Sequence, residues 1–103
     1  MLEKSGYARD TVVSFKIVNG DEIVAKIVSE DHGSFTIKNP CTVMPSQKGL
    51  GLIQSLFTSD LNKSIVLQKS HVMLHSPTVK DVEDYYIQTT TGITPVSAGG
   101  IIT

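Results

Sequence analysis

The sequence predicts an all-β fold with one helix: a small, strongly bent antiparallel barrel of five strands, followed by a C-terminal helix. Two observations support this prediction. Between residues 11 and 75, apolar and polar side chains alternate in short runs that are separated by turn signals. After Pro77 the apolar residues recur at helical spacing instead. The chain has 103 residues and a formal net charge of -1, which fits one globular domain.

The first two strands form the clearest unit of the sequence. Residues 11–18 alternate and lead into Asn19-Gly20, which is a strong hairpin signal because both residue types accept a positive φ. Residues 23–28 alternate again, so we expect the second strand there. Gly20 is therefore assigned to a structural turn.

The face of these strands opposite the core also carries apolar residues, which indicates a second buried surface. We consider the valines of this face as candidates to line or flank a contact between subunits: Val18, Val24, Val28 and, on a later strand, Val66.

The third strand begins after a turn at residues 30–33, in which Asp31 is expected to accept backbone N–H bonds. The strand starts near Phe35 and meets Asn39-Pro40. Because proline has no N–H to donate to a ladder, any continuation beyond Pro40 is an edge, a bulge or a bend.

Two further strands are predicted in the second half of the chain. A turn at residues 45–49 precedes an apolar stretch, residues 50–58, that is expected to pair back as a strand. After another turn, residues 64–75 form the last strand. The alternation loses phase near residues 69–71, which predicts a bend or a break there.

The C-terminal part is predicted to be helical over residues 79–91, before Gly92. Val79, Val82 and Tyr86 fall at helical spacing and are expected to form one buried stripe. The chain is thus divided into a flexible arm (1–10), a barrel (11–78), the helix (79–91) and a tail (92–103).

Composition excludes several classes of protein. The single cysteine, Cys41, excludes an internal disulfide and favours a cytoplasmic location. No apolar run reaches the ~18 residues that a membrane span needs. The nearly neutral charge argues against a protein that coats duplex DNA.

The sequence also favours a protein that is not an enzyme and has no metal or cofactor. His71 and His75 are four residues apart, so along a strand they lie about 13 Å from each other, too far to share one metal ion. No residues form a nucleophile elbow or a phosphate-binding loop.

Residues 15–35 resemble the first signature of the Sm/LSm/Hfq superfamily. In that signature a strand ends at a glycine turn, and a small residue, an aliphatic residue and an aspartate follow at fixed spacing; here these are Gly20, Ala25, Ile27 and Asp31. The order of the short motifs is similar to that of a small Sm-like family of marine cyanophages. The motifs are Gly20-Asp21-Glu22-Ile23, Lys38-Asn39-Pro40, Gly49-Leu50-Gly51-Leu52 and a helix after Pro77.

This resemblance implies an Sm-like (SH3-type) barrel that forms a homo-oligomeric ring and binds single-stranded RNA. It also implies a phage-encoded protein, which would lie in the cytoplasm of the host cell. The free strand edges of a short barrel independently favour a closed ring, which we expect to contain about five to seven subunits.

The resemblance places RNA at two loops that converge near the pore of the ring. His32 and Gly33 belong to the first loop, and the second loop contains Lys69, Ser70 and His71. In this interpretation Lys69 binds a phosphate, His71 binds a phosphate or a base edge, and His32 faces a base.

Two simpler interpretations remain open. The first loop is equally well explained as a polar hairpin turn, and Lys69 and His71 as a solvated strand end. The alternative function is a ring-forming scaffold, or a protein-interaction module, that does not bind nucleic acid.

Overall fold

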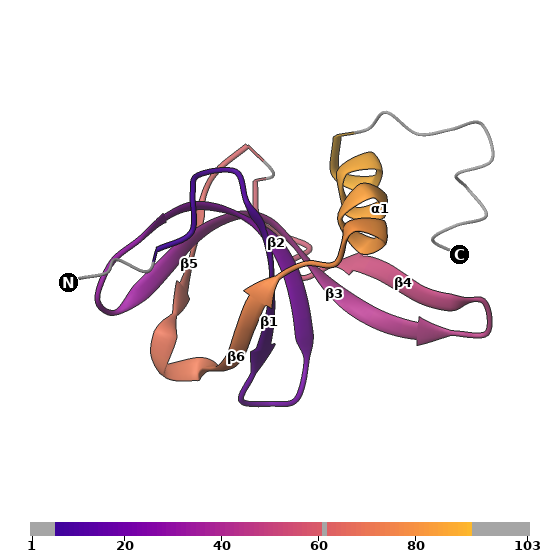
Figure 1. Cartoon of the computed structure of the whole chain (residues 1–103), viewed down its shortest axis with the longest axis horizontal. Helices are drawn as coiled ribbons and strands as arrows, with labels where there is room; N and C mark the ends of the chain where they lie inside the picture. Colours follow the sequence, from indigo (N-terminus) through magenta and orange to yellow (C-terminus); the bar gives the residue numbers. More distant parts are fainter. Residues whose placement is uncertain (1–5, 61, 92–103) are drawn as a thin grey trace.

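The structure, a computed structural model, describes residues 6–60 and 62–91. Residues 1–5 of the predicted arm and the predicted tail, residues 92–103, lie outside the described residues. The described part is mostly β, with one helix after the last strand (Figure 1). Its elements are β1 (Val12–Ile17), β2 (Glu22–Glu30), β3 (Ser34–Ser46), β4 (Gly49–Gln54), β5 (Ile65–Gln68), the short 3₁₀ helix η1 (Lys69–His71), β6 (Val72–Pro77) and α1 (Lys80–Thr91).

All six strands belong to one antiparallel sheet, with the order β4-β3-β2-β1-β6. β5 also pairs with β3, so β4 and β5 lie end to end along the same strand. The predicted five-stranded barrel is corrected in two respects. There are six strands rather than five, because the 3₁₀ turn η1 divides the last predicted strand into β5 and β6. This confirms the break predicted near residues 69–71. β5 pairs with β3 and β6 pairs with β1, but among the described residues no strand pairing joins β5 to β6. The sheet is therefore not closed.

The bend in β3 explains why two strands share it as a partner. Asn39 has a φ of 50°, which lies in the left-handed region. Pro40 follows and has no N–H for a ladder bond. The first part of β3 pairs with β5, and from Cys41 onward β3 pairs with β4. The predicted interruption at Pro40 is therefore confirmed as a bend inside one long strand.

The first hydrophobic core fills the concave side of the sheet. Phe15 and Phe35 lie at its centre, with ring centroids 5.0 Å apart and an interplanar angle of 61°. This edge-to-face contact adds about 0.5–1.5 kcal/mol to the effect of burial alone. The buried members of this core come mainly from alternate positions of β1, β2 and β3: Val13, Phe15, Ile23, Ala25, Ile27, Phe35 and Ile37.

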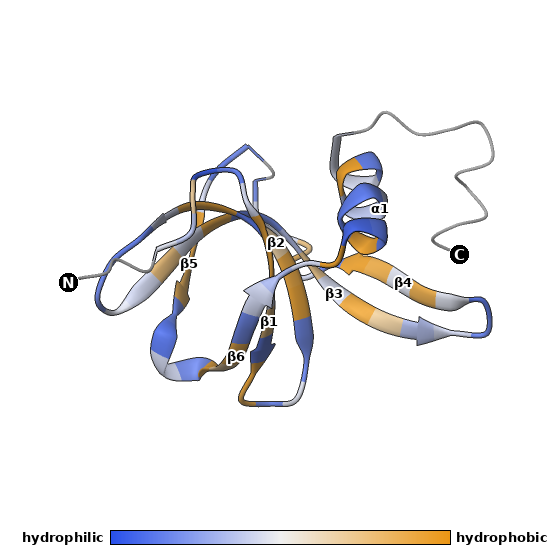
Figure 2. Ribbon diagram, in the orientation of Figure 1, coloured by the Kyte–Doolittle hydropathy of each residue, from blue (hydrophilic) through white to orange (hydrophobic). Residues whose placement is uncertain are grey.

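A second core lies on the other face of the sheet, under α1 (Figures 1 and 2). Val24 belongs to this core and is 1% exposed, so α1 and its neighbours cover it within one chain. Its proposed place in a subunit contact is therefore wrong. Val18 and Val66, by contrast, are exposed. The buried members of the second core are Val12, Val24, Cys41, Leu52 and Tyr86.

Tyr86 fixes α1 to the bend of β3. Its side chain is fully buried, and its single hydroxyl proton is shared between the backbone carbonyls of Lys38 and Asn39, each 3.0 Å from the hydroxyl oxygen. Burial raises the pKa of this phenol, so the hydroxyl keeps its proton. One side chain thus provides a donor to two backbone carbonyls at the bend.

The predicted helical stripe is partly wrong. Val82 and Tyr86 pack in the second core, but Val79 is 67% exposed. The reason is positional: Val79 lies just before the helix, and its carbonyl accepts the N–H of Glu83. Tyr85 completes the buried side instead.

A matched pair of substitutions tests how α1 is attached. Val82→Asp places a charge against the second core and is expected to lower the free energy of unfolding by about 2–4 kcal/mol. Val79→Asp introduces the same charge at an exposed position before the helix, where aspartate is a favourable N-cap, so stability should hold or rise slightly. Urea unfolding followed by circular dichroism measures both effects. Equal unfolding midpoints for the two variants would contradict this attachment.

Candidate nucleic-acid interface

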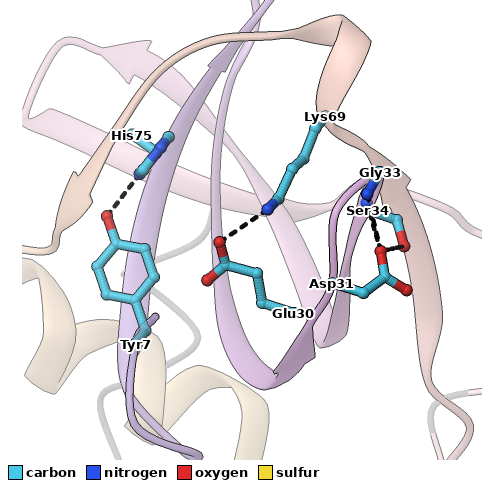
Figure 3. A network of polar contacts seen from close by, with 7 residues as sticks. All are labelled: Tyr7, Glu30, Asp31, Gly33, Ser34, Lys69 and His75. Atoms are coloured by element: carbon cyan, nitrogen blue, oxygen red, sulfur yellow. Dashed lines mark hydrogen bonds and ion pairs between the residues drawn. The ribbon is translucent and has the colours of Figure 1, made fainter. Parts of the chain in front are cut away.

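The loop between β2 and β3 is organised by the side chain of Asp31. Its Oδ1 accepts the backbone N–H of Gly33 and of Ser34, at 2.9 Å each, and the Ser34 hydroxyl at 3.1 Å. These hydrogen bonds, led by that from Gly33, lower the pKa of the Asp31 carboxyl. Asp31 therefore has the structural role predicted for it, and its carboxylate is engaged inside the turn (Figure 3).

The second predicted loop is the 3₁₀ helix η1, and it lies directly against the first. The backbone N–H of Lys69 donates to the carbonyl of Gly33 at 2.9 Å. At the other end of η1, the carbonyl of His71 accepts the N–H of Val18 at 2.9 Å. Two backbone bonds thus join η1 to the loop after β2 and to the β1–β2 hairpin. Segments that are distant in sequence are held side by side.

Most of the predicted site residues are accessible on this surface. His32, Gly33, Ser70 and His71 are all exposed. Gly33 has open space where a side chain would begin, so the loop presents backbone there rather than a stacking ring. Gly20, in the β1–β2 turn, has a φ of 96°, which confirms the conformational reason for a glycine in that turn.

Lys69 differs from the other predicted residues because its ammonium group is already paired. Its Nζ lies 2.8 Å from Oε2 of Glu30 (Figure 3). The same atom lies 5.1 Å from the centroid of the Phe35 ring. The other carboxylate oxygen of Glu30 is buried and has no hydrogen-bond partner. The ammonium therefore neutralises a partly buried carboxylate inside the chain.

Tyr7 and His75 form a second polar contact near this ion pair. The hydroxyl of Tyr7 and Nδ1 of His75 are 2.6 Å apart, and the two rings meet edge to face (Figure 3). His75 is also in edge-to-face contact with Phe35. Burial, and then the negative charge of Glu30, raise the pKa of the Tyr7 phenol. The described end of the predicted arm is thus packed on the first core.

The sequence interpretation did not assign roles to Tyr7, Glu30 or His75. One signal was available in the sequence: Tyr7 is the single aromatic residue of a mostly polar N-terminal stretch. It does not identify His75 as the partner of Tyr7, because His75 comes from a distant segment. The position of His75 opposite Phe15 in the β1–β6 ladder is a long-range pairing that the structure shows.

The two loops together present a polar surface. It presents two imidazoles, a hydroxyl and backbone groups beside one internal ion pair. Across residues 6–60 and 62–91, no cluster of three or more His, Cys, Asp and Glu side chains has the geometry to hold a metal ion. Burial raises the pKa of the Cys41 thiol to about 11, which suppresses its thiolate form. No helix within the described ranges is long and apolar enough to cross a membrane.

Neither a protein-family model nor a curated protein matches this sequence. The assignment of function therefore depends on the geometry described above.

The Asp31 turn predicts a specific dependence of stability on pH. The carboxyl has a lower pKa in the folded chain than in the unfolded chain, so its stabilising effect is present near neutral pH and is lost as pH falls through the folded pKa. Asp31→Ala should unfold at lower urea concentration than the unmodified chain at about pH 7, and the difference should shrink below about pH 4.

Asp60→Ala is the control, because among the described residues the Asp60 carboxylate accepts one backbone N–H, that of Asn62. The control should show a smaller loss at neutral pH. A difference between Asp31→Ala and the unmodified chain that stays constant down to about pH 2.5 would mean that the charge of Asp31 does not stabilise the turn.

Proposed function

We propose that this chain is a non-enzymatic, Sm-like RNA-binding protein that works as a homo-oligomeric ring and is encoded by a phage. The observation that supports RNA binding is the bond between Lys69 N–H and the Gly33 carbonyl, which brings the two predicted loops together. Through it, His32 of one loop and His71 of the other are presented near one end of β3. Exposed single-stranded bases bind to such loops by hydrogen bonds at their edges and by stacking.

Within this proposal the role of Lys69 changes. Its ammonium group is held by Glu30, so we assign it to positioning η1 rather than to binding a phosphate. The phosphate-binding role then passes to His71, and His32 keeps the base-facing role. Lys69→Ala is a poor test of RNA binding, because it leaves the Glu30 carboxylate partly buried and unpaired.

The ring is supported by the edges of the sheet. Among the described residues, β5 pairs only with β3 and β6 pairs only with β1, so each has an edge open to another chain. These edges carry exposed apolar side chains, including Val66 on β5 and Leu74 on β6. Pairing β6 of one copy with β5 of the next uses two different edges, and such a contact can close into a ring.

The same observations also favour a second candidate function, a ring-forming scaffold without nucleic acid. The one lysine of the predicted RNA site is neutralised by Glu30, and the chain has a net charge of -1. A surface with little positive charge gains little from the release of counterions by RNA. The two candidate functions therefore differ in whether the protein binds RNA.

RNA affinity distinguishes the two candidates. Labelled U-rich and A-rich oligoribonucleotides should bind the unmodified protein, and His71→Ala should weaken binding by about tenfold, or ~1.4 kcal/mol. Fluorescence anisotropy measures both effects.

Lys80→Ala is the control for this experiment, because Lys80 lies on α1 and pairs with Asp84. It should bind RNA as the unmodified protein does. A complete lack of RNA binding by the unmodified protein would favour the scaffold. Equal losses in Lys80→Ala and His71→Ala would show that binding is not localised to the two loops.

The ring has its own test. Light scattering at micromolar concentration should give a mass of at least about five to seven chains. Val66→Lys adds a charge to the open edge of β5, a device by which natural edges avoid pairing, and should reduce the ring to smaller species. A mass of one chain, 11.1 kDa, for the unmodified protein would exclude the ring.

A further inference from the structure

β4 is a third open edge, and it differs from the other two. Among the described residues it pairs only with β3, along Cys41–Ser46. The sequence from residue 39 to residue 59 contains a single charged side chain, that of Lys48 at the hairpin turn. Natural proteins protect exposed edges with charges, prolines or bulges. β4 itself has none of these charges or prolines, and Gly49 and Gly51 leave its backbone accessible.

The hairpin formed by β3 and β4 is also apolar on both of its faces. Figure 1 shows its tip extending away from the other strands, and Figure 2 shows the hydrophobic colouring of β4. Leu50 lies on the face that holds the buried Leu52, yet it is 53% exposed. Met44 and Ile53 belong to the opposite face, and both are exposed. A two-stranded ribbon with such faces is only marginally stable in water by itself.

The pairing proposed for the ring, between β6 of one copy and β5 of the next, does not reach β4. The bend at Asn39-Pro40 and the connection at residues 55–64 separate β4 from β5 along β3. β5 has four residues and β6 has six, so β6 of a neighbour extends past β5 by at most two residues. Three residues of β3, 38–40, separate the part of β3 that pairs with β5 from the part that pairs with β4. The β4 edge is therefore left over in each subunit of a ring.

We propose that β4 pairs in antiparallel orientation with β4 of a second copy of this chain, across a two-fold axis perpendicular to the ribbon. An isologous contact of this kind needs only a surface that is complementary to itself. β4 meets that condition because it is uncharged, so a copy brings no like charge against it. The axis passes near Gly51, where the backbones can approach closely, and both α1 helices lie on the same face of the joined four-stranded ribbon.

This contact does not require the ring. If the ring forms, isologous β4 pairs join two rings into one dihedral assembly with twice the mass. If the ring does not form, the same contact gives a dimer. A strand from another protein is the competing occupant, and it would leave the purified chain unpaired at β4.

The test compares two leucine-to-charge variants and their mixture. Leu50→Lys and Leu50→Glu each place like charges near each other across the two-fold axis, so the mass from light scattering should halve for either variant alone. Mixing the two variants should restore the full mass, because opposite charges then face each other. Restoration also shows that both variants are folded.

Phe57→Lys is the matched control, since Phe57 is 71% exposed and lies outside β4. It should leave the mass unchanged. Val66→Lys separates this inference from the ring: it should reduce the assembly to β4-linked dimers, and adding Leu50→Lys should then give single chains. An unchanged mass in both Leu50 variants would overturn the proposal. Halved masses that mixing fails to restore would overturn the two-fold geometry and indicate a contact between unlike surfaces.

Discussion

The contact between Tyr86 and the bend of β3 is the constraint on which the arrangement of the domain depends. Asn39 and Pro40 turn β3 so that one strand serves two partners, β5 before the bend and β4 after it. The Tyr86 hydroxyl shares its proton between the carbonyls of Lys38 and Asn39, and its ring packs in the second core. A buried phenol with two acceptors anchors α1 more firmly than its short apolar stripe alone. The helix is therefore part of the fold rather than an appendage.

Burial of both sheet faces within one chain has a consequence for assembly. The concave face holds the first core, and α1 covers Val24 and its neighbours on the other face. Each of the three strands with an open edge still carries an exposed apolar side chain: Val66 on β5, Leu74 on β6 and Leu50 on β4. Edge pairing provides directional backbone bonds in addition to apolar burial, which favours symmetric assemblies of defined geometry.

Local signals in the sequence predict the elements better than their long-range partners. Asn19-Gly20 fixes the first hairpin, and the loss of alternation near residue 70 marks η1 correctly. The interruption at Pro40 was also predictable, because proline lacks an N–H. In contrast, Val79 has the helical spacing of a buried residue but lies before the first residue of α1. Periodicity therefore predicts that Val79 is buried, whereas it is exposed. The sheet is open because β5 pairs with β3 and β6 pairs with β1. The alternation of apolar and polar residues does not show which strand each one pairs with.

In the candidate site, too, local sequence signals do not identify long-range partners. The resemblance to Sm-like proteins predicted that Lys69 lies near the first loop, and in the structure its backbone N–H donates to the Gly33 carbonyl. The partner of the Lys69 ammonium is Glu30, which lies thirty-nine residues away and gives no local signal. Moving the Lys69 ammonium from Glu30 to a phosphate would cost free energy, because it would leave a partly buried carboxylate beside Phe35 without its counter-charge. Any anion that binds this face is therefore recognised mainly by groups that are still available to it, namely the imidazoles of His32 and His71 and the exposed backbone of the two loops.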